Sequence, residues 1–221
     1  MARGEITEER LILAAERLYA DHGLDAVSLR QIADAAGQRN HAVVQYHFGS
    51  KAGLLRAIVR YRTGTAYELR EAALDELERT GRQHDVRGLL EVAIVPLVKS
   101  QPPGSNYLRF IVASQPAALA DAWHQMGVEH GATVNRINRY LDEALGHIPL
   151  PLRQARMGRA FDMVLRSLAD HFGGGSKSDV PRLPDDLFVE ELVLSGAAVL
   201  EAPLPPRSAQ RLRRRPHSSD S

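Results

Sequence analysis

The sequence of 221 residues contains no cysteine. This absence excludes disulfide bonds, thiol nucleophiles and zinc sites built from cysteine ligands. Lysine is also scarce, because only Lys51, Lys99 and Lys177 stand among the 28 basic residues. We attribute this skew toward arginine to the coding bias of GC-rich DNA rather than to function.

Long apolar runs are missing as well. No stretch is long and apolar enough to span a membrane, and the charged start, MARGEITEER, lacks the apolar segment of a secretory signal. We therefore expect a cytoplasmic protein with no membrane partner. The hydrophobic content of 44% is sufficient for a sizeable core, which favours a globular protein.

The spacings typical of enzymes and metal sites are absent too. His124, Glu129 and His130 do not have the spacing of a zinc-protease helix. The serines lack a G-x-S-x-G elbow, and the glycine-rich run 173–176 follows a predicted helix rather than a strand, unlike a phosphate-binding loop. We expect no enzymatic activity, no cofactor and no bound metal ion.

The most informative stretch runs from Ser28 to Lys51. Ser28 can cap a short helix, and Gln31 can return the hydrogen bond in a capping box. Gly37 ends this helix, and the apolar positions 42–44 and 48 predict a second helix. Its predicted outward side chains are Arg39, Asn40, His41, Gln45, Tyr46 and His47. Two short helices joined by a tight turn are typical of a helix-turn-helix, whose second helix enters the major groove of DNA.

Several side chains of this stretch suit DNA. Arginine, asparagine and glutamine can form paired hydrogen bonds with one base edge, while Lys51 at the start of the next helix suits a phosphate. Residues 28–62 carry six basic side chains against one acidic, Asp34, and such a focused basic patch suits a polyanion. The predicted DNA-contacting residues are Ser28, Arg30, Gln31, Arg39, Asn40, His41, Ala42, Gln45, Tyr46, His47 and Lys51.

This first quarter of the chain resembles the TetR family of bacterial transcriptional regulators. The set that carries the resemblance is Ala14, Ala15, Leu18, Tyr19, Gly23, Ser28, Ile32, Ala33, Gly37 and the run 46–51 leading into Leu54 and Leu55. Two departures stand out: the run from Gly37 to His47 is one residue longer than usual, and Gln45 occupies a position that is commonly tyrosine. Which side chain faces which base therefore stays open.

Beyond residue 50 the pattern is helical throughout, with no competing strand pattern. Helices are predicted from Lys51 onward and near 86–99, 106–114, 117–145, 152–172 and 185–201, separated by proline and glycine. The predicted fold class is all-α. We divide the chain into a three-helix DNA-binding domain at 1–50, a helical ligand-binding and dimerisation domain at 51–202, and a disordered basic tail at 203–221.

The last two predicted helices have unusually wide apolar surfaces. The family resemblance implies that they form a four-helix dimer interface with a second copy, and the alternative is that both helices are core. The residues assigned to this interface are Phe161, Val164, Leu165, Leu168, Phe188, Leu192, Gly196 and Val199. A dimer of helix-turn-helix domains reads an inverted repeat, so the predicted partner is a palindromic operator in double-stranded DNA.

A ligand pocket is implied by the resemblance and by no motif of its own. An apolar cavity with a few polar handles would form among Tyr67, Tyr107, Phe110, Trp123, His124 and Met126. The resulting hypothesis is a homodimeric repressor that a small-molecule effector releases from its operator. A DNA-binding or interaction protein without an effector, and a transcriptional activator, remain the alternatives.

Overall fold

A computed structural model describes residues 3–102, 104–114, 131–173 and 182–204, and within these ranges all regular secondary structure is helical. The predicted all-α fold class is therefore confirmed. In chain order the helices are α1 (Arg3–His22), α2 (Leu29–Ala35), α3 (Val43–Phe48), α4 (Lys51–Arg79), α5 (Val86–Lys99), α6 (Tyr107–Ala113), α8 (Gly131–Ala144), α9 (Leu150–Phe172) and α10 (Asp185–Glu201).

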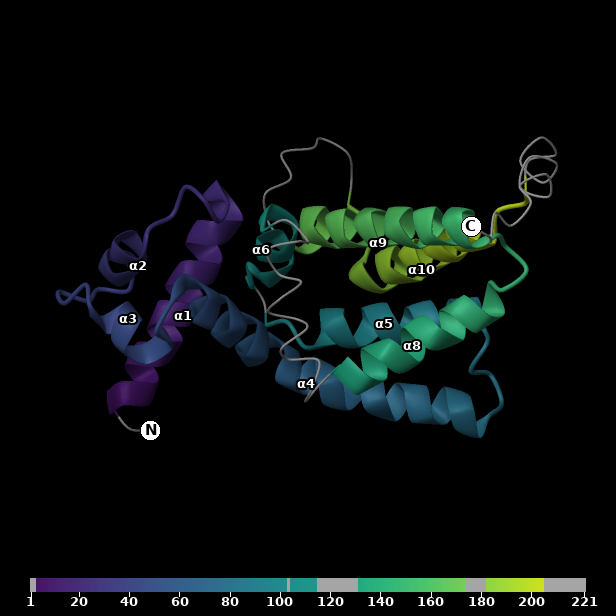
Figure 1. Ribbon diagram of the computed structural model, residues 1–221, viewed down its shortest axis with the longest axis horizontal. Coiled ribbons are helices and arrows are strands. Elements are labelled where there is room, and N and C mark those ends of the chain that lie inside the picture. Colours follow the sequence, from purple (N-terminus) through teal and green to yellow (C-terminus); the bar gives the residue numbers. More distant parts are fainter. Residues whose placement is uncertain (1–2, 103, 115–130, 174–181, 205–221) are drawn as a thin grey trace, which may run out of the picture.

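The first three helices form a small domain at one end of an elongated molecule (Figure 1). One face of α1 is buried, and Ile32 of α2 and Val44 of α3 close onto the same cluster. A helix-turn-helix is too small to bury a core by itself. The cluster is completed by the first turns of α4 and by Tyr107, Phe110 and Ile111 of α6.

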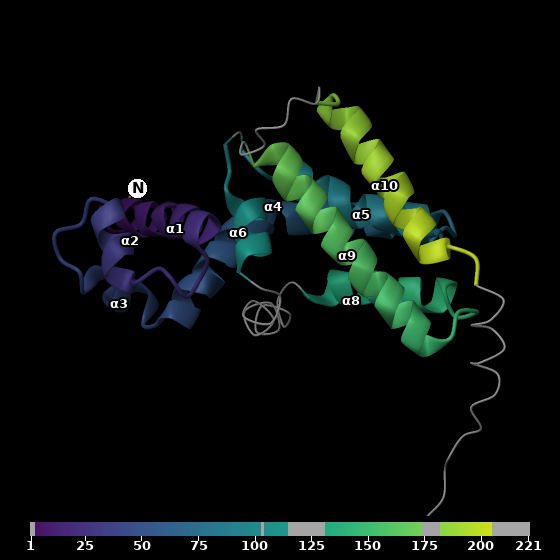
Figure 2. The same cartoon turned by 90° about the horizontal axis from the view of Figure 1, so that it is seen from above.

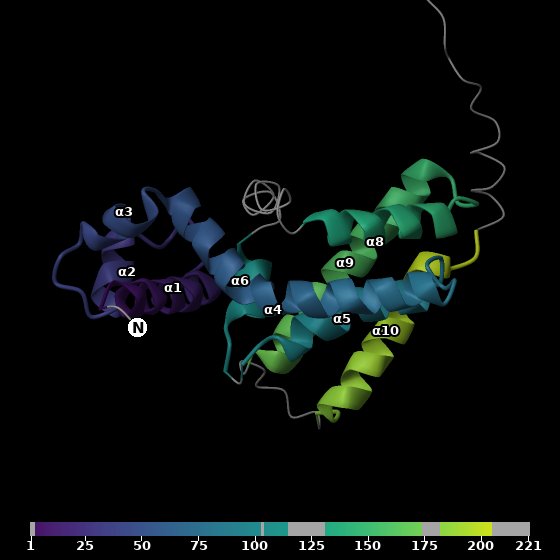
Figure 3. The same cartoon turned by 90° about the horizontal axis from the view of Figure 1, so that it is seen from below.

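Helix α4 connects this domain to the rest of the chain. It runs without interruption for 29 residues and passes through Gly64, so this glycine does not end the helix. Figure 3 shows α4 leaving the first three helices and continuing alongside α5. Because the helix is continuous, a displacement of either half is transmitted to the other as a rigid-body motion.

The C-terminal helices stack in layers above α4. Helices α5 and α8 pack against α4, and α10 packs on α5 while α9 runs beside α10 (Figures 1 and 2). The second hydrophobic cluster lies between these layers, with Leu74, Leu89, Leu145, Leu168 and Leu200 among its most buried members. Helix α6 packs against both α1 and α9 and so joins the two ends of the molecule.

Several predicted helix limits need adjustment. Helix α9 begins two residues earlier than predicted, since Pro151 is compatible with a first helical turn. Of the helix predicted at 117–145, the structure describes Gly131–Ala144; residues 115–130 lie outside the described ranges, as does most of the predicted tail.

Three ion pairs to a single arginine of α8 gather on the second half of α4. Arg136 of α8 pairs with Glu71 at 2.7 Å, with Asp75 at 3.0 Å and with Glu78 at 2.6 Å. We call these four residues the Arg136 cluster. Arg136 and the Tyr140 hydroxyl both donate hydrogen bonds to the Glu78 carboxylate, and these bonds hold the pKa of Glu78 below its ordinary value. The cluster fastens α4 to α8 at a partly exposed surface.

Candidate nucleic-acid interface

The first helix of the DNA-reading pair begins as the sequence predicts. The Ser28 hydroxyl accepts a hydrogen bond from the Gln31 amide at 3.3 Å, and the Gln31 side-chain oxygen accepts from the Ser28 amide at 2.8 Å. Both bonds of the capping box are therefore present. Gly37 follows the helix at φ 72°, a left-handed conformation that glycine adopts without strain.

The turn between α2 and α3 is longer than the sequence suggested. Arg39, Asn40 and His41 lie before α3, so the prediction that they lie on the second helix is wrong. The Asn40 side-chain oxygen accepts from the Ala42 amide at 3.0 Å. An asparagine side chain that accepts from the amide two residues on stabilises a turn, so the additional residue is absorbed into the turn and the helix begins only at Val43.

His41 is also engaged within the turn. Its Nε2 lies 2.7 Å from a carboxylate oxygen of Asp34 at the end of α2. This contact offsets the single acidic group of the basic stretch. Arg39 is exposed and has no ion pair with a described residue, which leaves its guanidinium available at the edge of α3.

Helix α3 presents a narrow outward surface. Val44 is buried and anchors the helix, while Ala42, Gln45 and Tyr46 are exposed; the Tyr46 side chain is 85% exposed. The Gln45 amide donates to the Gly49 carbonyl oxygen. Among the predicted readers on the helix, Tyr46 therefore projects furthest from the protein, whereas Gln45 folds back along its own helix.

Lys51 points into the protein rather than away from it. Its ammonium donates to the Leu24 carbonyl oxygen and lies 5.6 Å from the centre of the Tyr19 ring. Burial raises the pKa of the Tyr19 hydroxyl to about 12, so this ring stays neutral beneath the ammonium. Lys51 thus ties the start of α4 to the loop after α1.

The start of α4 requires a glycine that sequence reasoning missed. Ser50 caps the helix by accepting from the Gly53 amide at 3.0 Å. A Cβ atom at Gly53 would overlap the Phe48 carbonyl oxygen. Only glycine allows α3 and α4 to meet this closely. In the sequence, the requirement was visible only as a glycine in the first turn of a predicted helix.

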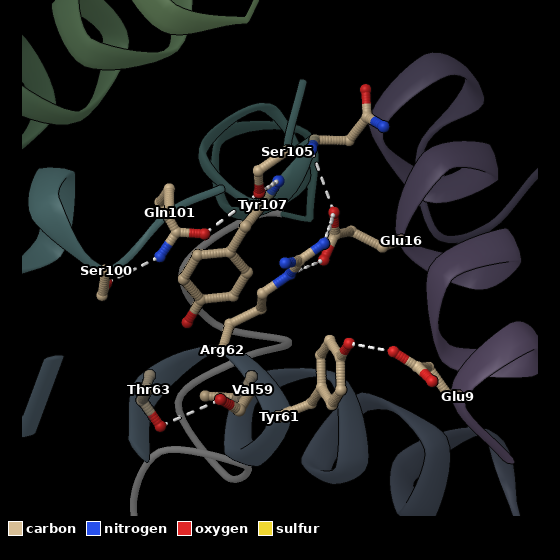
Figure 4. A network of polar contacts seen from close by, with 11 residues as sticks. Glu9, Glu16, Val59, Tyr61, Arg62, Thr63, Ser100, Gln101, Ser105 and Tyr107 are labelled. Carbon is tan, nitrogen blue, oxygen red and sulfur yellow. Dashed lines mark hydrogen bonds and ion pairs between the residues drawn. The ribbon is translucent and has the colours of Figure 1, made fainter. Parts of the chain in front are cut away.

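A buried ion pair joins the DNA-reading domain to the rest of the chain (Figure 4). Arg62 of α4 binds Glu16 of α1 with two hydrogen bonds, Nε to Oε2 at 2.6 Å and Nη2 to Oε1 at 3.0 Å. The Asn106 backbone amide, which precedes α6, donates to the same carboxylate at 3.0 Å. We call these three residues the Arg62 bridge. No sequence motif predicts the Arg62 bridge, because its members lie 44 or more positions apart.

Residues 11–58 match the family model described as bacterial regulatory proteins, tetR family. The matched range covers most of α1, all of α2 and α3, and the start of α4. The N-terminal domain is a TetR-family helix-turn-helix domain. The resemblance seen in the sequence is thereby confirmed.

Two solved structures are similar to the chain over most of its length. One is a TetR family transcription regulator from Marinobacter aquaeolei VT8, with 19% identity, coverage of 89% of this chain and 96% of that chain, and a TM-score of 0.46. The other is a putative TetR-family transcriptional regulator from Mesorhizobium loti MAFF303099, with 18% identity, coverage of 91% and 96%, and a TM-score of 0.43. No curated protein matches the chain.

The residues predicted to bind a ligand lie outside the TetR-family domain, and their surroundings differ from one residue to the next. Tyr107 and Phe110 are fully buried and pack in the cluster shared by α1, α4 and α6. Their rings stack 6.0 Å apart, and Phe110 lies 6.2 Å from Tyr19. Tyr67 is half-buried on α4. Trp123, His124 and Met126 lie outside the described residues.

The residues predicted for the dimer interface divide into two groups. Val164, Leu168, Leu192 and Gly196 are buried within the chain's own core, in line with the alternative that these helices are core. Phe161 is 46% exposed, and Leu165, Phe188 and Val199 are half-buried. Leu187 and Leu194 of α10, which sequence reasoning did not assign to the interface, are also exposed.

Metal binding and membrane insertion are two other properties that the described residues can be tested for. In the described ranges, no group of three or more histidine, aspartate or glutamate side chains is placed to hold a metal ion. None of the described helices combines the length and the apolar character needed to cross a membrane.

Proposed function

We propose that the protein is a sequence-specific transcriptional regulator that binds a palindromic operator as a homodimer and represses transcription until a small-molecule effector releases it. The observation that carries this proposal is the TetR-family domain itself, with its exposed α3 held on a buried core by Val44. An exposed recognition helix on a rigid support is the arrangement that base readout requires.

The structure suggests how the predicted DNA contacts divide their tasks. Tyr46 and Arg39 are exposed at α3 and are suited to base edges. Ser28, Arg30 and the first amides of α2 are suited to a phosphate. Asn40 shapes the turn and Lys51 braces α4, so these two support the interface from within the protein.

The dimer would form through the outward surfaces of α9 and α10. Phe161, Leu187 and Leu194 are each at least 40% exposed on these adjacent helices. Exposed large apolar side chains on neighbouring helices mark an association surface. A two-fold copy on this surface would present two α3 helices to successive major grooves, which accounts for a palindromic operator.

Effector control would act through α4 and α6. Helix α4 carries the DNA-reading domain at one end and packs against α5 and α8 at the other, while the Arg62 bridge fixes α1 to α4 and to the chain before α6. An effector that prefers one arrangement of these helices changes the distance between the two readers, and with it the affinity for the operator.

The deciding experiment is selection of bound duplexes from a random DNA pool by the full-length protein at one stated salt concentration. We expect an inverted repeat, bound roughly 10³-fold or more tightly than unrelated duplexes. Tyr46→Ala and Arg39→Ala should each cost about 1–3 kcal/mol on that operator and little on unrelated DNA. The exposed Arg139→Ala on α8, outside both the recognition helix and the proposed dimer surface, is the control. A pool with no enriched sequence would refute specific readout.

A further inference from the structure

An open cleft of about 570 Å³ lies between α1, the end of α2 and the chain before α6. This volume is within the range of roughly 300–1,000 Å³ found for small-molecule sites. Helix α1 supplies most of one wall, and the remaining lining comes from the turn after α2, from α4 and from the loop before α6. The lining residues are Arg10, Leu13, Ala14, Glu16, Arg17, Ala35, Ala36, Gly37, Arg62, Gly104 and Asn106.

The cleft has an excess of positive charge. Arg10 and Arg17 are exposed on the same side of α1, seven residues or about 10 Å apart along the helix. Neither forms an ion pair with a described residue. Glu16 is the one carboxylate of the lining, and both of its oxygens are taken by the Arg62 bridge. Two guanidinium groups therefore remain uncompensated.

The floor between the two arginines is apolar. Leu13 lies between them in the sequence and is 39% exposed, whereas Leu11, Ile12, Ala14 and Ala15 beside it on α1 are buried. Ala14, Ala35 and Ala36 extend this apolar surface. Their small side chains leave room for a ligand against the helix.

We propose that this cleft binds an amphipathic organic acid, with a carboxylate or phosphate head held by Arg10 and Arg17 and an apolar body against Leu13 and the alanines. Guanidinium groups bind carboxylates and phosphates through charge-assisted hydrogen bonds, and the apolar floor selects against small inorganic anions. The site is separate from the C-terminal residues first considered for an effector. Its existence does not depend on the operator.

Occupancy of the cleft would respond to the arrangement of the two domains. Gly37 belongs to the DNA-reading turn, whereas Gly104 and Asn106 precede α6. A ligand that touches both sides, beside the Arg62 bridge, binds best in one relative placement and stabilises that placement. The cleft is thus a second position from which a small molecule can influence α1 and α4.

The test is calorimetric titration of the full-length protein with decanoate, and in parallel with inorganic phosphate and with decanol. Decanoate should bind saturably with one molecule per chain, and the two partial probes should bind at least about tenfold more weakly, because each lacks one half of the complementary chemistry. Absence of saturable decanoate binding overturns the proposal, as does equal binding of decanol.

Variants then locate the bound decanoate. Arg10→Ala with Arg17→Ala should weaken binding by about tenfold or more through lost charge-assisted hydrogen bonds, and Ala35→Trp should do the same by filling the cleft. The matched control is Arg159→Ala with Arg166→Ala, two exposed arginines at the same spacing on α9 that do not line the cleft. Undiminished binding in either cleft variant overturns the proposal. Because no DNA is present, the result is independent of the operator selection.

Discussion

Helix α4 is fastened by two groups of ion pairs that use the same chemistry in different surroundings. In the Arg62 bridge, the side chains of Arg62 and Glu16 are 8% and 1% exposed. In the Arg136 cluster, Arg136 is 26% exposed and its carboxylate partners are 30% to 60% exposed. The bridge therefore excludes water from its charges, whereas the cluster shares its charges with solvent.

This difference sets how firmly each half of α4 is held. Removing one partner of a buried pair leaves an uncompensated charge in a low-dielectric site, so the bridge commits α1, α4 and the chain before α6 to one arrangement. Water and salt compete with an exposed pair, so the cluster can exchange partners at small cost. The ion pair between α4 and α1 is therefore shielded from solvent, whereas those between α4 and α8 are open to it.

Breaking the bridge should have the largest effect. Arg62→Ala is expected to lower the free energy of unfolding by about 3–5 kcal/mol, because Glu16 is left buried without its counterion. Urea unfolding at low and high salt is the measurement, and the loss should be nearly equal at both. Replacing both Arg62 and Glu16 by leucine is the control, and it should recover part of the loss. A loss below 1 kcal/mol for Arg62→Ala would contradict the comparison.

Breaking the cluster should cost much less. Arg136→Ala is expected to lower the free energy of unfolding by about 1 kcal/mol, since partly exposed pairs are screened. The same urea experiment should show this cost shrinking at high salt, unlike the cost of Arg62→Ala. The exposed Arg60→Ala on α4, which has no ion pair with a described residue, is the control for loss of charge. A cost that does not respond to salt would show that the cluster behaves as a buried group.

Acid should reduce the contribution of the Arg136 cluster to the free energy of unfolding. The pKa of Glu78 is lowered in the folded protein by the hydrogen bond from Arg136 and then by that from Tyr140, so its contribution to stability is present above the ordinary carboxyl value and is lost as the pH falls through the lowered one. The stability difference between the protein and its Glu78→Gln variant should hold from pH 7 to pH 5 and disappear in stronger acid. A constant difference down to pH 3 would contradict this assignment.

The smallest effect on stability is expected from an exposed hydrogen bond between α4 and α1. The Tyr61 hydroxyl donates to Glu9 at 2.6 Å, and this bond, followed by partial burial, raises the pKa of Tyr61. Tyr61→Phe should lower the free energy of unfolding by about 0.5 kcal/mol, because both groups remain accessible to water. Thermal unfolding of the two proteins measures this change. A loss comparable to that of Arg62→Ala would mean that burial is not what separates the two contacts.

Local features of the fold were predictable because they depend on neighbours in the chain. The capping box of Ser28 and Gln31 and the stop at Gly37 involve residues within a few positions, where spacing alone decides which groups can meet. Helical periodicity likewise indicated the all-α class. The resemblance carried by the first quarter of the chain was specific enough to identify the family of that domain.

The burial of individual side chains and the long-range contacts could be assigned only from the tertiary structure. The apolar spacing of α9 and α10 identifies both helices but cannot tell that Leu168 is buried while Phe161 is exposed, because that depends on which face of α9 meets α6 and α10. The one-residue insertion before α3 could be counted, yet only the folded turn shows that the Asn40 side chain binds the Ala42 amide within it. The inward course of Lys51 and the pairing of Arg62 with Glu16 depend on contacts across 27 and 46 positions. Such contacts are fixed by packing of whole helices, which short-range sequence patterns do not encode.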